Sequence, residues 1–143
     1  MATIVHDNFR NAQLGNPAAP TTTVDFDADD IRCSLIDQTD VTITAAMDSY
    51  DDVDADPVAE GAAMTGKTVG STTGVFDSTV DYTFSSVAQG LDAADYLVLY
   101  KYNATPANAT LIITWDTTTT GLPVTPNGGD ITVQWNGSGI LQI

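Results

Sequence analysis

The segment Tyr96-Leu97-Val98-Leu99-Tyr100-Lys101-Tyr102 decides the fold, because it is apolar on both faces of an extended strand. Alternate residues of a strand point to opposite faces, so the tyrosines and Val98 would share one face while Leu97 and Leu99 share the other. Such a strand must be covered on both sides. We therefore predict that residues 96–102 form a central strand.

Strand-like alternation recurs on either side of this segment. The alternating apolar sets are Ile31, Cys33 and Leu35; Val80, Tyr82 and Phe84; Leu111, Ile113 and Trp115; and Ile131, Val133 and Trp135. Each set predicts a strand with one buried face, and Cys33 is expected to be buried as a small apolar residue. The glycine-rich connection 136–139 predicts a hairpin that pairs residues 140–143 with the strand ending at Trp135.

Two segments have helical spacing. Val5, Phe9 and Ala12 predict a short helix over residues 4–14, and the apolar positions within residues 40–50 predict a second one. The acidic run that follows, residues 51–57, is expected to be a solvated loop, because like charges and Pro57 oppose regular structure.

These patterns predict one domain over residues 1–143, with residues 1–20 as an N-terminal helix or arm. The fold class is all-β: an antiparallel β-sandwich or jelly-roll-like fold with one or two short helices near the N-terminus.

The charge of the chain limits its partners. Nineteen acidic residues against four Lys and Arg give a formal net charge of −15. Such a surface repels nucleic-acid phosphates and anionic lipids, so we expect no nucleic-acid partner and no membrane partner. The sequence has neither a secretory signal pattern nor an apolar run long enough to span a membrane.

The side chains for nucleophilic or acid–base catalysis are scarce. His6 is the only histidine and lies near the N-terminus, where we expect fraying, and Cys33 is expected to be buried. We predict that the chain is not an enzyme and needs no cofactor. Carboxylate pairs are abundant, so a carboxylate-based hydrolase stays open as an alternative, although loop aspartates favour a hydrated, non-catalytic role.

Asp25, Asp27 and Asp29 are the candidate metal ligands. They occupy positions 1, 3 and 5 of a possible calcium loop, but Asp30 replaces the glycine of position 6 and Ile36 replaces the glutamate of position 12. The spacing therefore excludes an EF-hand and favours solvated acidic loops over a divalent-cation site.

Residues 61–68 satisfy the phosphate-loop pattern G-x-x-x-x-G-K-[ST]. A working phosphate loop follows a buried strand and opens a helix, whereas this segment follows a charged loop and precedes a Gly/Thr-rich stretch. We expect no nucleotide site here.

The C-terminal half resembles a family of small structural proteins of tailed phages. The resemblance lies in the segments Asp95–Lys101, Ala109–Asp116, Gly129–Asn136 and Gly139–Leu141, with weaker likeness at Asn8–Ala12, Asp30–Ile36, Phe76–Asp77 and Tyr82–Ser86. In residues 61–65 the chain departs from the Gly-x-Gly-Tyr-Thr-like motif of the family, so a role tied to that motif does not carry over.

The resemblance implies a virion component, most often a head decoration or cement protein. Its partners would be the major capsid protein and copies of itself. The protein would be synthesised in the host cytoplasm and lie on the outer surface of the capsid. The alternative is a tail, fibre or baseplate component, including a host-glycan-binding module that uses exposed aromatic residues such as Tyr102 or Trp115.

Overall fold

Strand β7 (Tyr96–Lys101) lies in the middle of a five-stranded antiparallel sheet. The computed structural model, which describes residues 3–16 and 23–142, gives this sheet the order β1-β8-β7-β2-β3. The other strands are β1 (Thr3–Val5), β8 (Thr110–Trp115), β2 (Ile31–Ile36) and β3 (Pro57–Glu60). The prediction of a central strand is confirmed.

The two faces of β7 are buried in different cores, as the alternation predicts. Leu97 and Leu99 join Cys33 in one apolar cluster, whereas Val98 and Tyr100 join a second cluster on the opposite face. Cys33 is fully buried, and burial raises the pKa of its thiol well above the usual value. It is a core residue, as expected.

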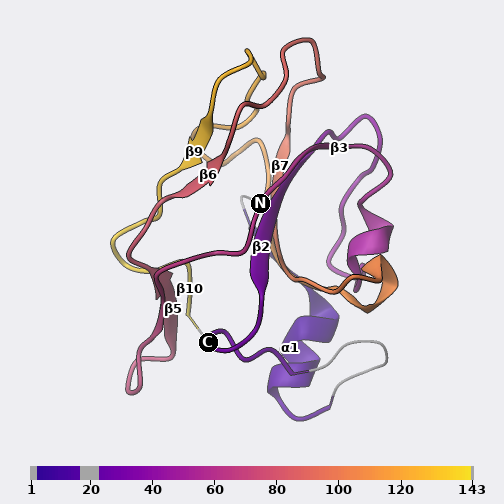
Figure 1. Cartoon of the computed structure of the whole chain (residues 1–143). Helices are drawn as coiled ribbons and strands as arrows, with labels where there is room; N and C mark the ends of the chain where they lie inside the picture. The colour runs from indigo at the N-terminus through magenta and orange to yellow at the C-terminus, as the bar shows by residue number, and fades with distance from the viewer. Residues whose placement is uncertain (1–2, 17–22, 143) are drawn as a thin grey trace.

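Two smaller sheets cover the first face. They are β10-β5-β4 and β6-β9, and Figure 1 shows the β6–β9 and β5–β10 pairs together on one side of β2. Their bounds are β4 (Lys67–Val69), β5 (Val75–Ser78), β6 (Tyr82–Phe84), β9 (Ile131–Val133) and β10 (Leu141–Gln142). The side chains of Phe76, Tyr82 and Phe84 pack in one core cluster with apolar residues of the central sheet. The fold is therefore mainly β, antiparallel and β-sandwich-like, as predicted.

The second face is covered by irregular segments and not by the predicted helix over residues 40–50. That prediction is wrong: the segment consists of turns that lead into a short 3-10 helix, Tyr50–Asp52. Its backbone pairs with the start of β8, where Tyr50 N–H donates to the carbonyl of Ala109. The Tyr50 ring then stacks on Tyr100 with 4.1 Å between ring centroids. These long-range contacts outweigh the helical spacing.

The predicted N-terminal helix exists but starts later than expected. Helix α1 spans Asp7–Gln13 and buries Phe9 and Ala12, whereas Thr3–Val5 pairs with β8 as strand β1. Of the expected N-terminal arm, residues 1–2 and 17–20 lie outside the described residues. In the described part of the chain, no helix is long and apolar enough to cross a membrane.

The acidic segment 51–57 is only partly the loop that its charges predict. Tyr50–Asp52 is a 3-10 turn, and Pro57 begins β3, which pairs with β2 at the edge of the sheet. An edge strand tolerates proline, because the backbone N–H that proline lacks is not needed on the side of the strand that faces away from the sheet.

The predicted C-terminal hairpin is wrong, because β9 and β10 do not pair with each other. Strand β9 pairs with β6, and β10 pairs with β5. Between them the N–H of Ser138 donates to the Asn136 side chain, and Gly139 has a φ of 104°. This turn redirects the chain from one small sheet to the other, and β9 ends at Val133, before Trp135.

Candidate functional site: a tryptophan-lined cleft

A cleft of about 760 Å³ lies at one end of the sandwich. This volume lies within the range of small-molecule sites, roughly 300–1,000 Å³. We call it the Trp115–Trp135 cleft, after the two indole rings that line it. Its apolar lining also includes Leu35, Leu97, Leu122, Val124, Ile131, Val133 and Ile140.

The central sheet supplies one side of the cleft. Trp115 is the last residue of β8 and lies opposite Leu97 of β7 and Thr3 of β1 in register. It therefore shares the face of Leu97, which belongs to the core cluster beneath the small sheets. Because β8 ends here, the Trp115 side chain is only partly buried.

The loop after β8 supplies a second wall. Asp116 holds its start, since the N–H and hydroxyl of Thr118 both donate to the Asp116 carboxylate, which lowers the pKa of that group. The loop returns to the sheet where Val124 exchanges backbone hydrogen bonds of 2.9 and 3.0 Å with Ala94. Leu122 on this loop faces the cleft.

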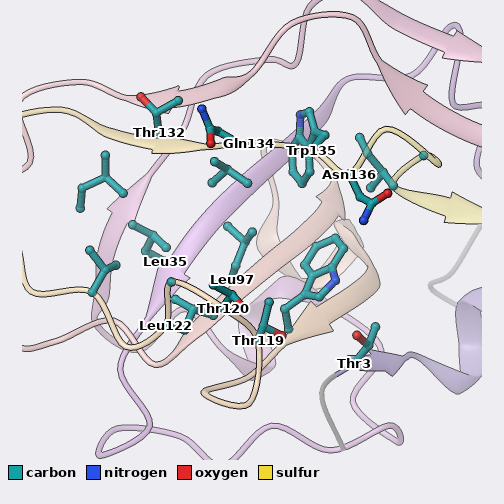
Figure 2. Close-up of a pocket in the computed structure, with 17 residues that line it drawn as sticks. Thr3, Leu35, Leu97, Thr119, Thr120, Leu122, Thr132, Gln134, Trp135 and Asn136 are labelled. Carbon is teal, nitrogen blue, oxygen red and sulfur yellow. The ribbon is translucent and has the colours of Figure 1, made fainter.

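The segment after β9 supplies the opposite wall. Figure 2 shows Trp135 and Asn136 on this segment, with Leu35 and Leu97 between them and the loop that carries Thr120 and Leu122. The rings of Trp115 and Trp135 lie with centroids 6.1 Å apart and planes inclined at 45°. Two tryptophans that are twenty positions apart in the sequence thus form one aromatic surface.

One polar atom of this wall has no partner. The Nε1 atom of Trp135 is buried and makes no hydrogen bond to any described residue. A buried donor without an acceptor destabilises a protein by about 1–3 kcal/mol. The packing of the indole ring against the apolar core must offset this loss.

The sequence pointed to Trp115 but not to its pairing with Trp135. Tyr102, the other aromatic candidate, comes directly after the last residue of β7. The Cζ atom of Arg32 lies 3.5 Å from the centroid of its ring. Leu97 pairs with Trp115 and Lys101 with Thr110, so Tyr102 and Trp115 lie at opposite ends of the strand pair and form no common site. The available signal was that both tryptophans stand last on an alternating strand face.

The candidate metal ligands lie in a turn just before β2. Both Asp27 N–H and Ala28 N–H donate to Asp25 Oδ1 at 3.1 Å, and Asp25 N–H donates to Asp29 Oδ2 at 2.8 Å. Asp29 Oδ2 also forms an ion pair of 2.9 Å with Lys101. Within residues 3–16 and 23–142, no group of three or more His, Cys, Asp or Glu side chains is arranged to hold a metal ion.

His6 is buried and does not fray as its position in the sequence predicts. Its ring bridges the carbonyl of Met47 and the hydroxyl of Thr114, each at 2.9 Å. Because a carbonyl only accepts, Nδ1 carries the proton, and Nε2 accepts from Thr114. Burial lowers the pKa of His6. This ring is thus part of the interior and not of the cleft.

The segment that matches the phosphate-loop pattern connects two strands. Gly61 follows β3 and Lys67 begins β4, so the match is not followed by a helix. Gly61 lies against the ring of Tyr82, where a Cβ atom would overlap it, and Lys67 Nζ donates to the carbonyl of Asp29. Close packing and an internal contact account for the glycine and the lysine of the match.

Comparison with known proteins adds no relative. No protein-family model matches the chain, and no curated protein is significantly similar to it.

Proposed function

We propose that this chain is a non-enzymatic structural protein of a tailed-phage particle, and specifically a capsid decoration protein. It would bind the outside of the head, bridge or stabilise major-capsid subunits, and associate with copies of itself. The observation that carries this proposal is the resemblance quoted above, whose strongest segments coincide with β7, β8 and β9, while a weaker one coincides with β2.

The roles of the loop aspartates support a structural protein. Asp25, Asp37 and Asp116 each accept backbone N–H groups of their own turns, and hydrogen bonds from Thr39 and Thr118 lower the pKa of Asp37 and Asp116. The lowered pKa keeps Asp37 and Asp116 ionised at neutral pH, and all three side chains stabilise their turns. A carboxylic acid catalyst needs the opposite shift, an elevated pKa. Desolvation and neighbouring carboxylates raise the pKa of Asp40 and Asp54, but neither residue lines the Trp115–Trp135 cleft.

A decoration role is also compatible with weak individual contacts. A shell presents many equivalent sites, so an oligomeric module gains avidity without a large interface for each copy. The acidic loops would add negative charge to the outer surface of the particle.

The test is the number of copies in purified particles of the phage that encodes this chain. Quantitative mass spectrometry against the major capsid protein should give on the order of hundreds of copies per particle. A count of about a dozen or fewer would overturn the decoration proposal and favour the tail, fibre or baseplate alternative.

A second arm tests placement on the outer surface. Limited proteolysis of intact particles should cleave this chain, whereas protein segments inside the shell should stay uncleaved. Protection of the chain until the particle is opened would contradict an external position.

A further inference from the structure

The Trp115–Trp135 cleft differs from the rest of the molecule in its charge. The chain carries a net charge of −15, yet none of the described residues that line the cleft is Asp, Glu, Lys, Arg or His. An anionic ligand would find no cation there and would be repelled by the surrounding surface, and a cation would find no carboxylate. The lining therefore favours an uncharged ligand.

The side chains of the cleft suit a ligand that is apolar on one face and hydroxylated at its edge. Trp115 and Trp135 present flat apolar surfaces, and Thr120 and Asn136 add an exposed hydroxyl and amide at the rim. Hydroxyl and amide groups both donate and accept hydrogen bonds. A pyranose ring has this combination, since its C–H groups form an apolar face and its hydroxyls surround the edge.

The unpaired indole N–H of Trp135 does not itself open onto the cleft. It is the only buried side-chain donor or acceptor without a partner in the described part of the chain, and it belongs to a cleft residue. A ligand in the cleft would therefore contact the face of the Trp135 ring and not this N–H.

We propose that the Trp115–Trp135 cleft binds a neutral saccharide, with a pyranose ring packed against the two indoles. This inference goes beyond the proposed decoration function, which needs only contacts with the shell and with other copies. It assigns the chain a second role, attachment of the particle to uncharged glycans.

The two tryptophans of the chain make the test direct. Both line the cleft and the sequence has no others, so tryptophan emission of the full-length protein reports on this cleft alone. The probes are neutral trisaccharides (maltotriose, cellotriose and N,N′,N″-triacetylchitotriose) and one anionic analogue, trigalacturonic acid. We expect a saturable change in emission with at least one neutral probe below roughly 10 mM and none with the anionic probe.

Variants locate the binding site. Trp135→Leu removes an aromatic wall and should weaken binding at least about tenfold, read from the emission of Trp115. Thr120→Val keeps the side-chain shape at an exposed position and should weaken binding about two- to fivefold without affecting the fold. The matched control is Tyr102→Ala, an exposed aromatic at the other end of the sheet, which should bind as the wild type does.

Three results would overturn the proposal. The first is the absence of any saturable response to the neutral probes. The second is binding that survives both Trp135→Leu and Thr120→Val or that is lost in Tyr102→Ala. The third is an emission change that follows protein concentration together with a rise in molar mass by light scattering, because a second copy of the chain would then occupy the cleft. None of these results bears on the copy number in particles, so the two proposals fail separately.

Discussion

His6 makes the stability of the protein depend on pH. The buried ring is neutral in the folded state, with both nitrogens occupied by Met47 and Thr114. Its folded pKa is below 6.5, so at lower pH the unfolded chain takes up a proton that the folded chain does not. We expect the free energy of unfolding to fall as the pH drops through about 6.5, by at most about 1.4 kcal/mol per pH unit.

The measurement is urea unfolding from pH 7.5 to 5.5 in wild type and in His6→Asn, which keeps a donor near the Nδ1 position. The carboxylates near the ring, Asp7 and Asp52, are present in both proteins, so the difference between the two profiles isolates His6. The variant should be less stable at pH 7.5, and the gap should narrow toward pH 5.5. Parallel profiles would show that His6 does not titrate as proposed.

Residue burial was predictable wherever it followed a strand period. Cys33 and the two faces of β7 follow directly from alternation. His6 was not predictable, because its burial depends on Thr3–Val5 pairing with β8, a contact between residues more than a hundred positions apart. Trp135 was likewise recognised as an alternating residue but not as a partner of Trp115, because Trp115 ends β8 of the central sheet whereas Trp135 follows β9 of another sheet.

Variants of Asp25 can show how the aspartates of the turn 25–29 stabilise it. Asp25 Oδ1 accepts two backbone N–H groups, so its role requires an oxygen acceptor and not a charge. Asp25→Asn keeps that oxygen and should leave the melting temperature near that of the wild type, whereas Asp25→Ala should lower it by about 3 °C. Thermal unfolding in EDTA measures both.

The same variants separate turn stabilisation from calcium binding. If Asp25 were a calcium ligand, added calcium would raise the melting temperature of the wild type, and Asp25→Asn would lose that increase as fully as Asp25→Ala does. That outcome would contradict an exclusively structural role of this loop.

Elements were predicted in proportion to their apolar periodicity. The six-residue strands β2, β7 and β8 were recognised, and so were the three-residue strands β6 and β9, because all five carry alternating apolar residues. Strands β1 and β3 were not recognised, because neither has such an alternating set and each depends on a neighbour for pairing. The helix expected over residues 40–50 does not form, because a short helix is only marginally stable by itself and the stacking of Tyr50 on Tyr100 stabilises the non-helical conformation instead.

At the scale of the whole molecule, the sandwich was predictable and its connections were not. Alternating segments with glycine-rich turns require two packed layers. The sequence does not state which edge each short strand joins, so β9 and β10 were assigned to one hairpin although they belong to two sheets. The cleft arises from this division, because the chain between β9 and β10 crosses from one sheet to the other and leaves Trp135 beside Trp115.

The excess negative charge should make the folded chain more stable in salt. Four Lys and Arg residues face nineteen carboxylates, and folding brings these carboxylates closer together than they are in the unfolded chain. Salt shortens the Debye length from about 30 Å at 0.01 M to about 8 Å at 0.15 M, which screens this repulsion. We expect the melting temperature to rise by roughly 3–6 °C between these concentrations, equivalent to about 1–2 kcal/mol. Screening depends on ionic strength alone, so sodium chloride and potassium chloride should raise the melting temperature equally. Calcium chloride at matched ionic strength should give the same increase, with no additional part that EDTA removes.

A melting temperature that falls with salt would mean that the described ion pairs, such as Lys101–Asp29 and Arg32–Asp30, outweigh the repulsion among the remaining carboxylates.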